Sequence, residues 1–380
     1  MLKNVTLALL GGLSCLACSD TEAPGHPIEA DQILQDLANE LTANRQLPGL
    51  ILAEFSCEDR AFAWSGIQKI DRSDPIFPQS LFALGSNSKS FLALAAMRLS
   101  ERGDIDLNEP LSALWPNIAA DRPDLSDITL THLLSHSSGL AAFNTGAELN
   151  RVPDFATRGT SIILQAAEWF LAQPMVGQPG QQTLYSNAGY VVAGAWLEAK
   201  TGQSYQELID TYVAEPLGLS TSYGQPRFLA ANGIYGHYIS DDQAVAYTED
   251  DPPIPAFLEP AGNIVLSMPD YVTYLQAHLC ALQDLPSAVI SLDGYKALHT
   301  PAINEGVGLG WSLVELGGAD TSFHIGGTGD FTAYAALSAQ RNKGVAALLN
   351  VGGAPAASVQ AWVVEAMSVP EISVSETAED

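Results

Sequence analysis

The chain has 380 residues, 47 % of them hydrophobic, which indicates a globular protein able to bury one large core or two lobes that share a cleft. Acidic residues outnumber basic ones by 43 to 16, so the formal net charge at pH 7 is -27. Such a surface repels nucleic acid and anionic lipid, and we interpret the dispersed acids as a solvated surface suited to a saline habitat.

The first 18 residues are typical of an export signal. Lys3 precedes an apolar stretch over 5–16 that is too short to span a bilayer. Cys18 follows a small residue, as in the processing site of bacterial lipoproteins, although Cys15 stands where such sites usually carry leucine. We expect export to the periplasm, a lipid on Cys18 as the only link to a membrane, in this case the outer membrane, and a linker over 19–28.

A helix, two strands and a second helix are predicted next. Helical spacing of apolar residues predicts the first helix over 27–44, and apolar runs on either side of a polar turn predict strands over 50–55 and 61–67. The second helix is predicted to begin near Ser86 and to end at Gly103.

A Ser-x-x-Lys motif, Ser86 and Lys89, lies at the start of this second helix. On the first turn of a helix, positions i and i+3 share a face, so the Ser86 hydroxyl and the Lys89 amine can come within hydrogen-bonding reach. Among the six lysines, only Lys89 has a serine three residues upstream. The pair indicates a serine nucleophile, provided that an apolar cleft or a nearby charge lowers the pKa of Lys89.

Residues 104–255 are predicted to form helices joined by long loops. The helical segments lie at 130–136, 160–172, 188–200 and 205–213. Tyr185 and Asn187 form a Tyr-x-Asn element before the third of them, and no other tyrosine of the twelve has an asparagine two residues on. His132 and His136 could share a helix face and bind a metal, but no third ligand is evident. We therefore favour a structural role for both, and expect neither a metal nor a cofactor.

The C-terminal part is predicted to return the chain to the first lobe. A helix over 269–282 is followed by four strands and a last helix, at 310–316, 322–326, 332–337, 344–350 and 354–367. The second of these strands carries the sequence His-Ile-Gly-Gly at 324–327. The acidic end, 369–380, is expected to be disordered.

Cys57 and Cys280 are the two cysteines outside the signal. In an oxidising compartment they could form a disulfide, and two buried free thiols are an equal alternative. The sequence does not decide between them.

Three elements in this order, Ser-x-x-Lys, Tyr-x-Asn and His-x-Gly, resemble those of the serine β-lactamase and DD-peptidase superfamily. The resemblance covers about residues 29–367 and is strongest to the branch of class C β-lactamases, D-alanyl-D-alanine carboxypeptidases and family VIII esterases. It implies an α+β fold with an antiparallel sheet flanked by helices and the active site in a cleft. The α/β lobe and an inserted helical lobe would be formed by residues 29–105 plus 256–368 and by residues 106–255.

The resemblance also implies roles for the motif residues. Ser86 would attack a carbonyl and form an acyl-enzyme, Lys89 and Tyr185 would carry its proton, and Tyr185 would later activate the deacylating water. Asn187 would hold Lys89 in place and bind the substrate. The backbone NH groups of Ser86 and Gly327 would form the oxyanion hole.

The strand motif departs from the usual pattern of this superfamily. His324 stands where many relatives carry lysine, a variant that this branch accepts. Gly326 and Gly327 would let a substrate approach the strand edge without a side-chain clash. Ile325 stands where relatives carry threonine or serine to bind a substrate carboxylate. We therefore expect neutral short-chain esters to be hydrolysed better than substrates that carry a carboxylate.

The sequence thus predicts an exported serine hydrolase that acts on an ester, an amide or a peptidoglycan peptide, as a carboxylesterase or a D-Ala-D-Ala carboxypeptidase-like peptidase. A β-lactamase is one alternative. A non-catalytic cell-wall-binding or sensor lipoprotein is another, but a silent descendant need not retain the serine, lysine, tyrosine and asparagine together.

Overall fold

One antiparallel sheet of six strands forms the centre of the fold. The computed structural model describes residues 28–43, 46–155, 161–229, 233–353 and 356–369. The strands of the sheet are β1 (Gly49–Phe55), β2 (Arg60–Gly66), β8 (Ser312–Leu316), β9 (Ala319–Gly327), β10 (Thr332–Ser338) and β11 (Lys343–Leu349). Their order is β2-β1-β11-β10-β9-β8, and each neighbouring pair is antiparallel.

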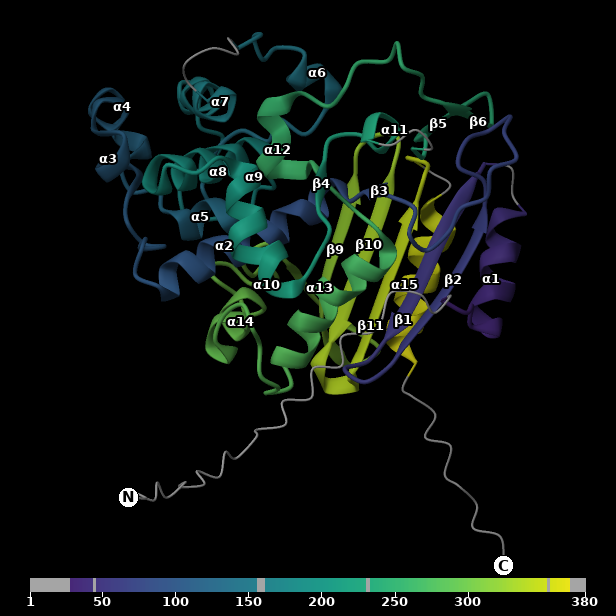
Figure 1. The fold of residues 1–380 in the computed structure, drawn as a ribbon. Coiled ribbons are helices and arrows are strands. Elements are labelled where there is room, and N and C mark those ends of the chain that lie inside the picture. Colours follow the sequence, from purple (N-terminus) through teal and green to yellow (C-terminus); the bar gives the residue numbers. More distant parts are fainter. Residues whose placement is uncertain (1–27, 44–45, 156–160, 230–232, 354–355, 370–380) are drawn as a thin grey trace, which may run out of the picture.

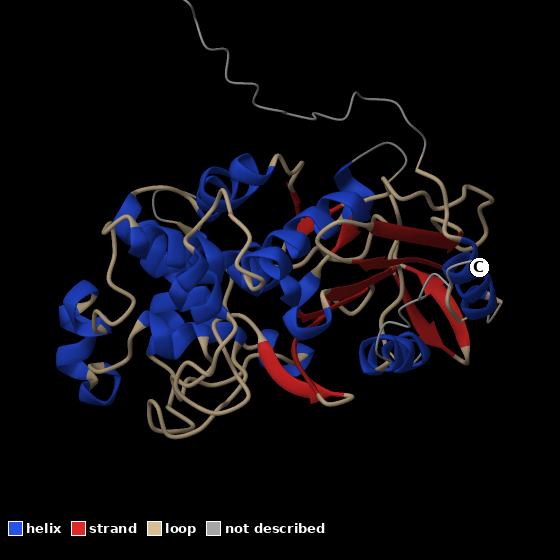
Figure 2. Ribbon diagram, turned by 90° about the horizontal axis from the view of Figure 1, so that it is seen from below, coloured by secondary structure: helices blue, strands red, loops and turns tan. Residues whose placement is uncertain are grey.

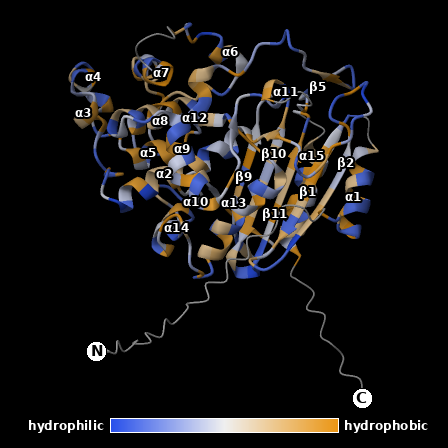
Figure 3. Cartoon of the chain, viewed as in Figure 1, coloured by the Kyte–Doolittle hydropathy of each residue, from blue (hydrophilic) through white to orange (hydrophobic). Residues whose placement is uncertain are grey.

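Helices cover both faces of this sheet (Figures 1 and 2). α1 (Gln32–Thr42) and α15 (Ala356–Ser368) lie on one face, and α13 (Met268–Ala281) lies on the other. Successive residues of β1 join different cores, because Leu50 packs on the α15 side and Ile51 on the α13 side. A sheet that is buried on both faces needs nearly continuous apolar strands, and Figure 3 shows hydrophobic residues concentrated in the central strands and inner helices.

The remaining long helices gather beside the sheet. Ser186 caps the start of α8 (Asn187–Thr201), because its side chain accepts a hydrogen bond from Gly189 N. α7 (Ile162–Leu171) packs along α8. α2 (Ser88–Glu101) is buried along most of its length. The shorter helices are α3 (Leu111–Leu114), α4 (Pro116–Asp121), α5 (Leu130–Leu134), α6 (Gly146–Leu149), α9 (Tyr205–Ile209), α10 (Glu215–Leu217), α11 (Pro226–Leu229), α12 (Glu259–Gly262) and α14 (Leu292–Leu298).

Two small sheets complete the secondary structure. The first has the order β3-β7-β4, formed by residues Phe82–Ala83, Ile264–Leu266 and Ser222–Tyr223. The second is a hairpin of β5 (His237–Ser240) and β6 (Gln243–Ala246). His237 N donates to Asp330 O at 3.0 Å, so this hairpin packs against the large sheet although it belongs to the segment predicted as a helical lobe.

The predicted strands and long helices are present, with bounds that differ by a few residues. Ser86 lies in a 3₁₀ turn, Gly85–Asn87, that precedes α2, and not in the first turn of the α-helix. The sequence pattern predicts neither α14, whose Gly294 is a poor helix former, nor the short hairpin of β5 and β6. The helix predicted at 205–213 ends at Ile209 and continues as a π-helical turn.

Cys57 and Cys280 form a disulfide, with their Cα atoms 5.4 Å apart. The bond joins the turn between β1 and β2 to the last turn of α13. The structure thereby decides between the two alternatives that the sequence leaves open.

Both predicted terminal segments lie largely outside the described residues. Residues 1–27 include the predicted signal, Cys18 and most of the predicted linker, and residues 370–380 include most of the acidic end. Within the described ranges, no helix is both long and apolar enough to cross a membrane.

Candidate active site

The turn that carries Ser86 lies against the end of β9. Gly85 has φ +51°, and a Cβ on it would lie 2.6 Å from Gly327 N. A Cβ on Gly326 would collide with the carbonyl oxygen of Leu84. Both glycines are therefore required by the close approach of the two backbones, which brings the Gly327 backbone beside the serine.

The prediction that Gly326 and Gly327 both make room for a substrate is wrong for Gly326. Gly326 is buried, and its missing side chain makes space for the Ser86 turn and not for a ligand. Gly327 is exposed, and a Cβ there would have only Phe331 O within 4 Å, at 3.9 Å. Gly327 therefore remains the glycine that a substrate can approach.

The Ser86 hydroxyl lies between an amine and a phenol. Lys89 Nζ donates to Ser86 Oγ at 3.0 Å, and Tyr185 OH donates to the same oxygen at 2.6 Å. Lys89 Nζ also donates to the carbonyl oxygen of Ala261 at 2.6 Å. The three side chains come from α2, the turn before it and the segment before α8, so the fold assembles them from distant parts of the sequence.

Burial changes the acidity of Lys89. Its side chain is fully buried, and this burial lowers the pKa of the amine, while the neighbouring Tyr185 phenol opposes the shift. An uncharged amine can accept a proton, whereas an ammonium cannot. The environment thus favours the form of Lys89 that can act as a base toward the Ser86 hydroxyl.

His136 holds the segment that carries Tyr185. Its Nδ1 accepts from Ser186 N at 3.1 Å, its carbonyl oxygen accepts from Leu184 N at 2.7 Å, and its ring lies 4.4 Å from the Tyr185 ring. Burial places the pKa of His136 well below its ordinary value, so the ring is neutral. The sequence gives no signal for this role beyond the position of the histidine.

His132 and His136 have no third metal ligand beside them among the residues that the structure describes. His132 Nδ1 lies 2.8 Å from Thr129 Oγ1, and this contact belongs to the capping box at the start of α5. His132 therefore has a structural role. Within the part of the chain that the structure describes, no three His, Cys, Asp or Glu side chains gather as metal ligands.

Asn187 does not hold Lys89, contrary to the role that the resemblance implies. Its Nδ2 donates to the carbonyl oxygen of Phe143 at 3.1 Å, and the backbone of Ala261 holds the amine instead. Asn187 still lines the hollow beside Ser86, so substrate binding by this residue stays a prediction.

His324 is buried and uncharged. Its Nδ1 lies 3.0 Å from Ile325 O, and burial lowers its pKa to about 3. It therefore does not supply the positive charge of the lysine that many relatives carry at this position. Ile325 is 40 % exposed, and its side chain faces the opposite side of β9 from that of His324.

Two hollows flank the reacting groups. One, of about 450 Å³, is lined by Ser86, Asn187 and Gly327, with amide side chains and apolar walls from Asn144, Leu149, Gln225, Pro252, Pro253, Ile254, Pro255 and Leu258. The other, of about 300 Å³, is lined by Tyr185, His324 and Ile325 together with Val307, Trp311 and Phe323. Neither group of lining residues includes an arginine or a lysine.

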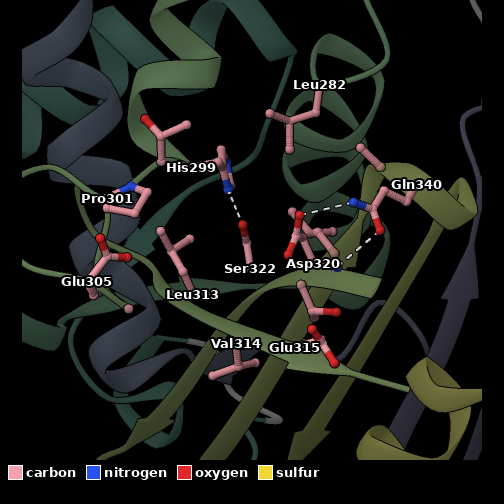
Figure 4. A pocket seen from close by; sticks show the side chains of 15 residues that line it. Leu282, His299, Pro301, Glu305, Leu313, Val314, Glu315, Asp320, Ser322 and Gln340 are labelled. Atoms are coloured by element: carbon pink, nitrogen blue, oxygen red, sulfur yellow. Dashed lines mark hydrogen bonds between the residues drawn. The ribbon is translucent and has the colours of Figure 1, made fainter. Parts of the chain in front are cut away.

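A third hollow, of about 470 Å³, lies toward the other end of β9 and contains none of the reacting groups. Figure 4 shows its lining, in which His299 Nδ1 lies 2.7 Å from Ser322 Oγ and Asp320 bonds to Gln340. The chemistry therefore belongs to the two hollows beside Ser86 and not to this one.

An antiparallel sheet flanked by helices, with a serine, a buried lysine and a tyrosine in mutual contact, defines the class of serine hydrolases that the sequence predicts. The family model "Beta-lactamase" matches residues 34–366, and the chain belongs to this family.

Known relatives agree with this assignment. A β-lactamase of Escherichia coli is 29 % identical over 59 % of this chain, and the match spans only 54 % of that protein. Penicillin-binding protein 4 of Amycolatopsis lactamdurans is 27 % identical over 84 % of both chains. The structure of a class C β-lactamase from Rhodobacter sphaeroides has the same fold, with a TM-score of 0.68, 18 % identity, and coverage of 87 % of this chain and 97 % of that one.

Proposed function

We propose that this protein is an exported acyl-transfer enzyme that hydrolyses neutral esters or amides through an acyl-enzyme at Ser86. The observation that carries the proposal is the contact of one serine hydroxyl with both a buried amine and a phenol. Carboxylesterase activity fits the cleft best, and a D-Ala-D-Ala carboxypeptidase-like activity is the second candidate.

In the proposed acylation step, Ser86 Oγ forms a bond to the substrate carbonyl carbon and its proton passes to the uncharged Lys89 amine. The negative charge on the carbonyl oxygen is stabilised by the NH groups of Ser86 and Gly327, and one such donor contributes about 3 kcal/mol. The bond to the leaving group then breaks, and the leaving group receives a proton through Tyr185. In deacylation, water attacks the acyl carbon as its proton passes to Tyr185, whose own phenol proton moves to the uncharged Lys89 amine. The bond from the acyl carbon to Ser86 Oγ then breaks, and Lys89 returns a proton to the serine.

The lining of the cleft supports neutral substrates. Its described residues offer no arginine or lysine to a substrate carboxylate, and His324 is uncharged. Ile325 lacks the hydroxyl that would donate a hydrogen bond to that carboxylate. A hydrogen bond to a charged group contributes about 1.5–3 kcal/mol, so its loss weakens such substrates by roughly tenfold to a hundredfold.

A parallel assay tests the substrate class. A short-chain p-nitrophenyl ester, a D-Ala-D-Ala peptide and a cephalosporin are given to the wild type, to Ile325→Thr and to Val314→Thr. Val314 is a matched control, because it is similarly exposed at 41 % but lies on β8. We expect ester cleavage by all three proteins and a shift toward the carboxylate substrates in Ile325→Thr alone. Efficient cephalosporin hydrolysis by the wild type without ester cleavage would overturn the proposal.

Export is supported by the disulfide between Cys57 and Cys280, since such bonds persist in oxidising compartments. The lipid on Cys18 rests on the sequence pattern alone. Cell fractionation of the wild type and of Cys18→Ala tests it. We expect the wild type in the membrane fraction and the variant in the soluble periplasm. A soluble wild type with an unmodified N-terminus would reject the lipid anchor and leave export standing.

A further inference from the structure

A buried ion pair lies at the wall of the cleft, where Asp330 lines the hollow beside Ser86 and Arg227 lies behind it. Arg227 on α11 and Asp330 in the turn between β9 and β10 have side chains that are 1 % and 2 % exposed. Their Nη1 and Oδ2 atoms are 3.7 Å apart. Buried charges of this kind are expensive unless they are paired, so each of these groups depends on the other.

Asp330 is the centre of the turn that follows Gly327. Its Oδ1 accepts from Thr328 Oγ1 at 2.6 Å, and its carbonyl oxygen accepts from His237 N at 3.0 Å. Thr328 closes the turn, because its N donates to Phe331 O at 3.2 Å and its Oγ1 accepts from Phe331 N at 3.1 Å. The orientation of Asp330 therefore sets the conformation of the backbone directly after Gly327.

Arg227 ties this turn to the opposite wall of the cleft. Its Nη2 donates to Asp251 O at 3.0 Å, one residue before the proline-rich wall at 252–255. The guanidinium also lies over the rings of Phe228 and Tyr247, at 4.6 and 5.7 Å from their centroids. One side chain thus contacts α11, the wall segment and the β9–β10 turn.

Burial alone would favour a protonated Asp330. Desolvation raises the pKa of this carboxyl, and the hydroxyl of Thr328 and the charge of Arg227 oppose the rise. Asp330 Oδ2 and both Nε and Nη1 of Arg227 have no hydrogen-bond partner among the described atoms, so the charges face each other across 3.7 Å without a hydrogen bond. The Thr328 hydroxyl and, second to it, the charge of Arg227 compensate the buried charge of Asp330, so removal of Arg227 would leave this carboxylate less stabilised within the turn.

We propose that Arg227 is a positioning residue for catalysis, which holds the β9–β10 turn through Asp330 and so keeps the Gly327 NH aimed at the oxyanion. The inference rests on the proposed function, because it gives Gly327 a task only if Ser86 forms a tetrahedral intermediate. Arg227 does not itself line the cleft, so its proposed effect on catalysis passes through Asp330 and the turn.

The test compares Arg227→Met with Arg122→Met. Arg122 is a matched control, because it also bonds an aspartate, Asp124, and two carbonyl oxygens, those of Leu171 and Gln173, but lies outside the cleft lining. The kcat and KM for a p-nitrophenyl ester and the rate of labelling by a fluorophosphonate are measured below the Tm of each variant. In Arg227→Met we expect kcat and the labelling rate to fall about 100-fold, as for a lost oxyanion donor, with KM changed less than about threefold.

Arg122→Met should keep its kcat within about twofold, even if its Tm falls, because none of the Arg122 partners, Asp124, Leu171 and Gln173, lines the cleft. Arg227→Lys keeps the charge and should lose less than Arg227→Met. A folded Arg227→Met with wild-type kcat, or an equal loss in Arg122→Met, overturns the inference. If Arg227→Met does not fold, Asp330→Asn against Asp124→Asn gives the same comparison with isosteric changes. Retained labelling in Ser86→Ala would instead reject the proposed function itself.

Discussion

Lys89 is fully buried in the folded protein, and this burial disfavours its charged form. Burial lowers its folded pKa below the ordinary value of 10.5, so the unfolded chain binds more protons between these two values. The free energy of unfolding therefore gains a contribution as pH rises from the folded pKa toward 10.5, and at lower pH the full penalty of the buried amine remains.

Lys89→Met should remove this penalty and the base together. We expect the variant to be inactive and, at pH 7, more stable by about 1 kcal/mol or more, since replacing buried ionic groups with apolar ones is often stabilising. Its stability should also rise less between neutral and alkaline pH. Urea unfolding at several pH values measures both effects, and a variant less stable than the wild type at every pH would contradict the account.

Tyr185 is the second group whose loss should affect the chemistry. Tyr185→Phe keeps the ring beside His136 and removes only the hydroxyl that contacts Ser86 Oγ. We expect kcat to fall about 100-fold or more, as is usual when a general base is lost, with little change in Tm. Steady-state kinetics beside a thermal melt distinguish this from misfolding, and wild-type turnover would remove Tyr185 from the mechanism.

The sequence predicts the contacts among Ser86, Lys89 and Tyr185 because each depends on the type of side chain. It does not predict the bond from Lys89 to Ala261 O, since any residue can offer a carbonyl oxygen. The predicted partner of Asn187, Lys89, is wrong for the same reason, because the Asn187 side-chain amide donates instead to the backbone oxygen of Phe143. Backbone partners follow from the fold and not from a motif.

At the scale of elements, the disulfide fixes α13 to the β1–β2 turn. It joins residues 223 positions apart, so it restricts the unfolded chain strongly. We expect the double variant Cys57→Ala and Cys280→Ala to lose about 2–5 kcal/mol of unfolding free energy, with the kcat of the folded protein unchanged. Chemical unfolding of the two proteins, with reduced wild type as a control, measures the loss. Equal stability of all three would show that the bond contributes nothing.

The strands of the large sheet are predictable because burial on both faces demands apolar runs such as those of β1 and β11. The hairpin of β5 and β6 is not predictable, since each strand has four residues of which only one, His237 or Ala244, is buried. Its position depends on the bond from His237 N to Asp330 O in the β9–β10 turn. Ser86 occupies a 3₁₀ turn before α2, and the three-residue spacing from Ser86 to Lys89 cannot distinguish such a turn from the first turn of an α-helix.

At the scale of the whole molecule, the order of the three motifs predicts the α+β fold and the family. It does not predict the substrate, because the hollows beside Ser86 are lined by residues from α6, by Gln225 directly before α11, by the wall at 252–255 and by β9. These segments meet only through tertiary packing. The ion pair of Arg227 and Asp330 is likewise invisible in the sequence, since 103 positions separate its partners.

The central claim is that Ser86 carries the acyl group, and intact mass spectrometry tests it most directly. The wild type, Ser86→Ala and Ser322→Ala are treated with a fluorophosphonate. Ser322 is the control, because its hydroxyl lies 2.7 Å from His299 Nδ1, away from the reacting groups. We predict one added group on the wild type and on Ser322→Ala, located at Ser86 by peptide mapping, and none on Ser86→Ala. Full labelling of Ser86→Ala would contradict the account.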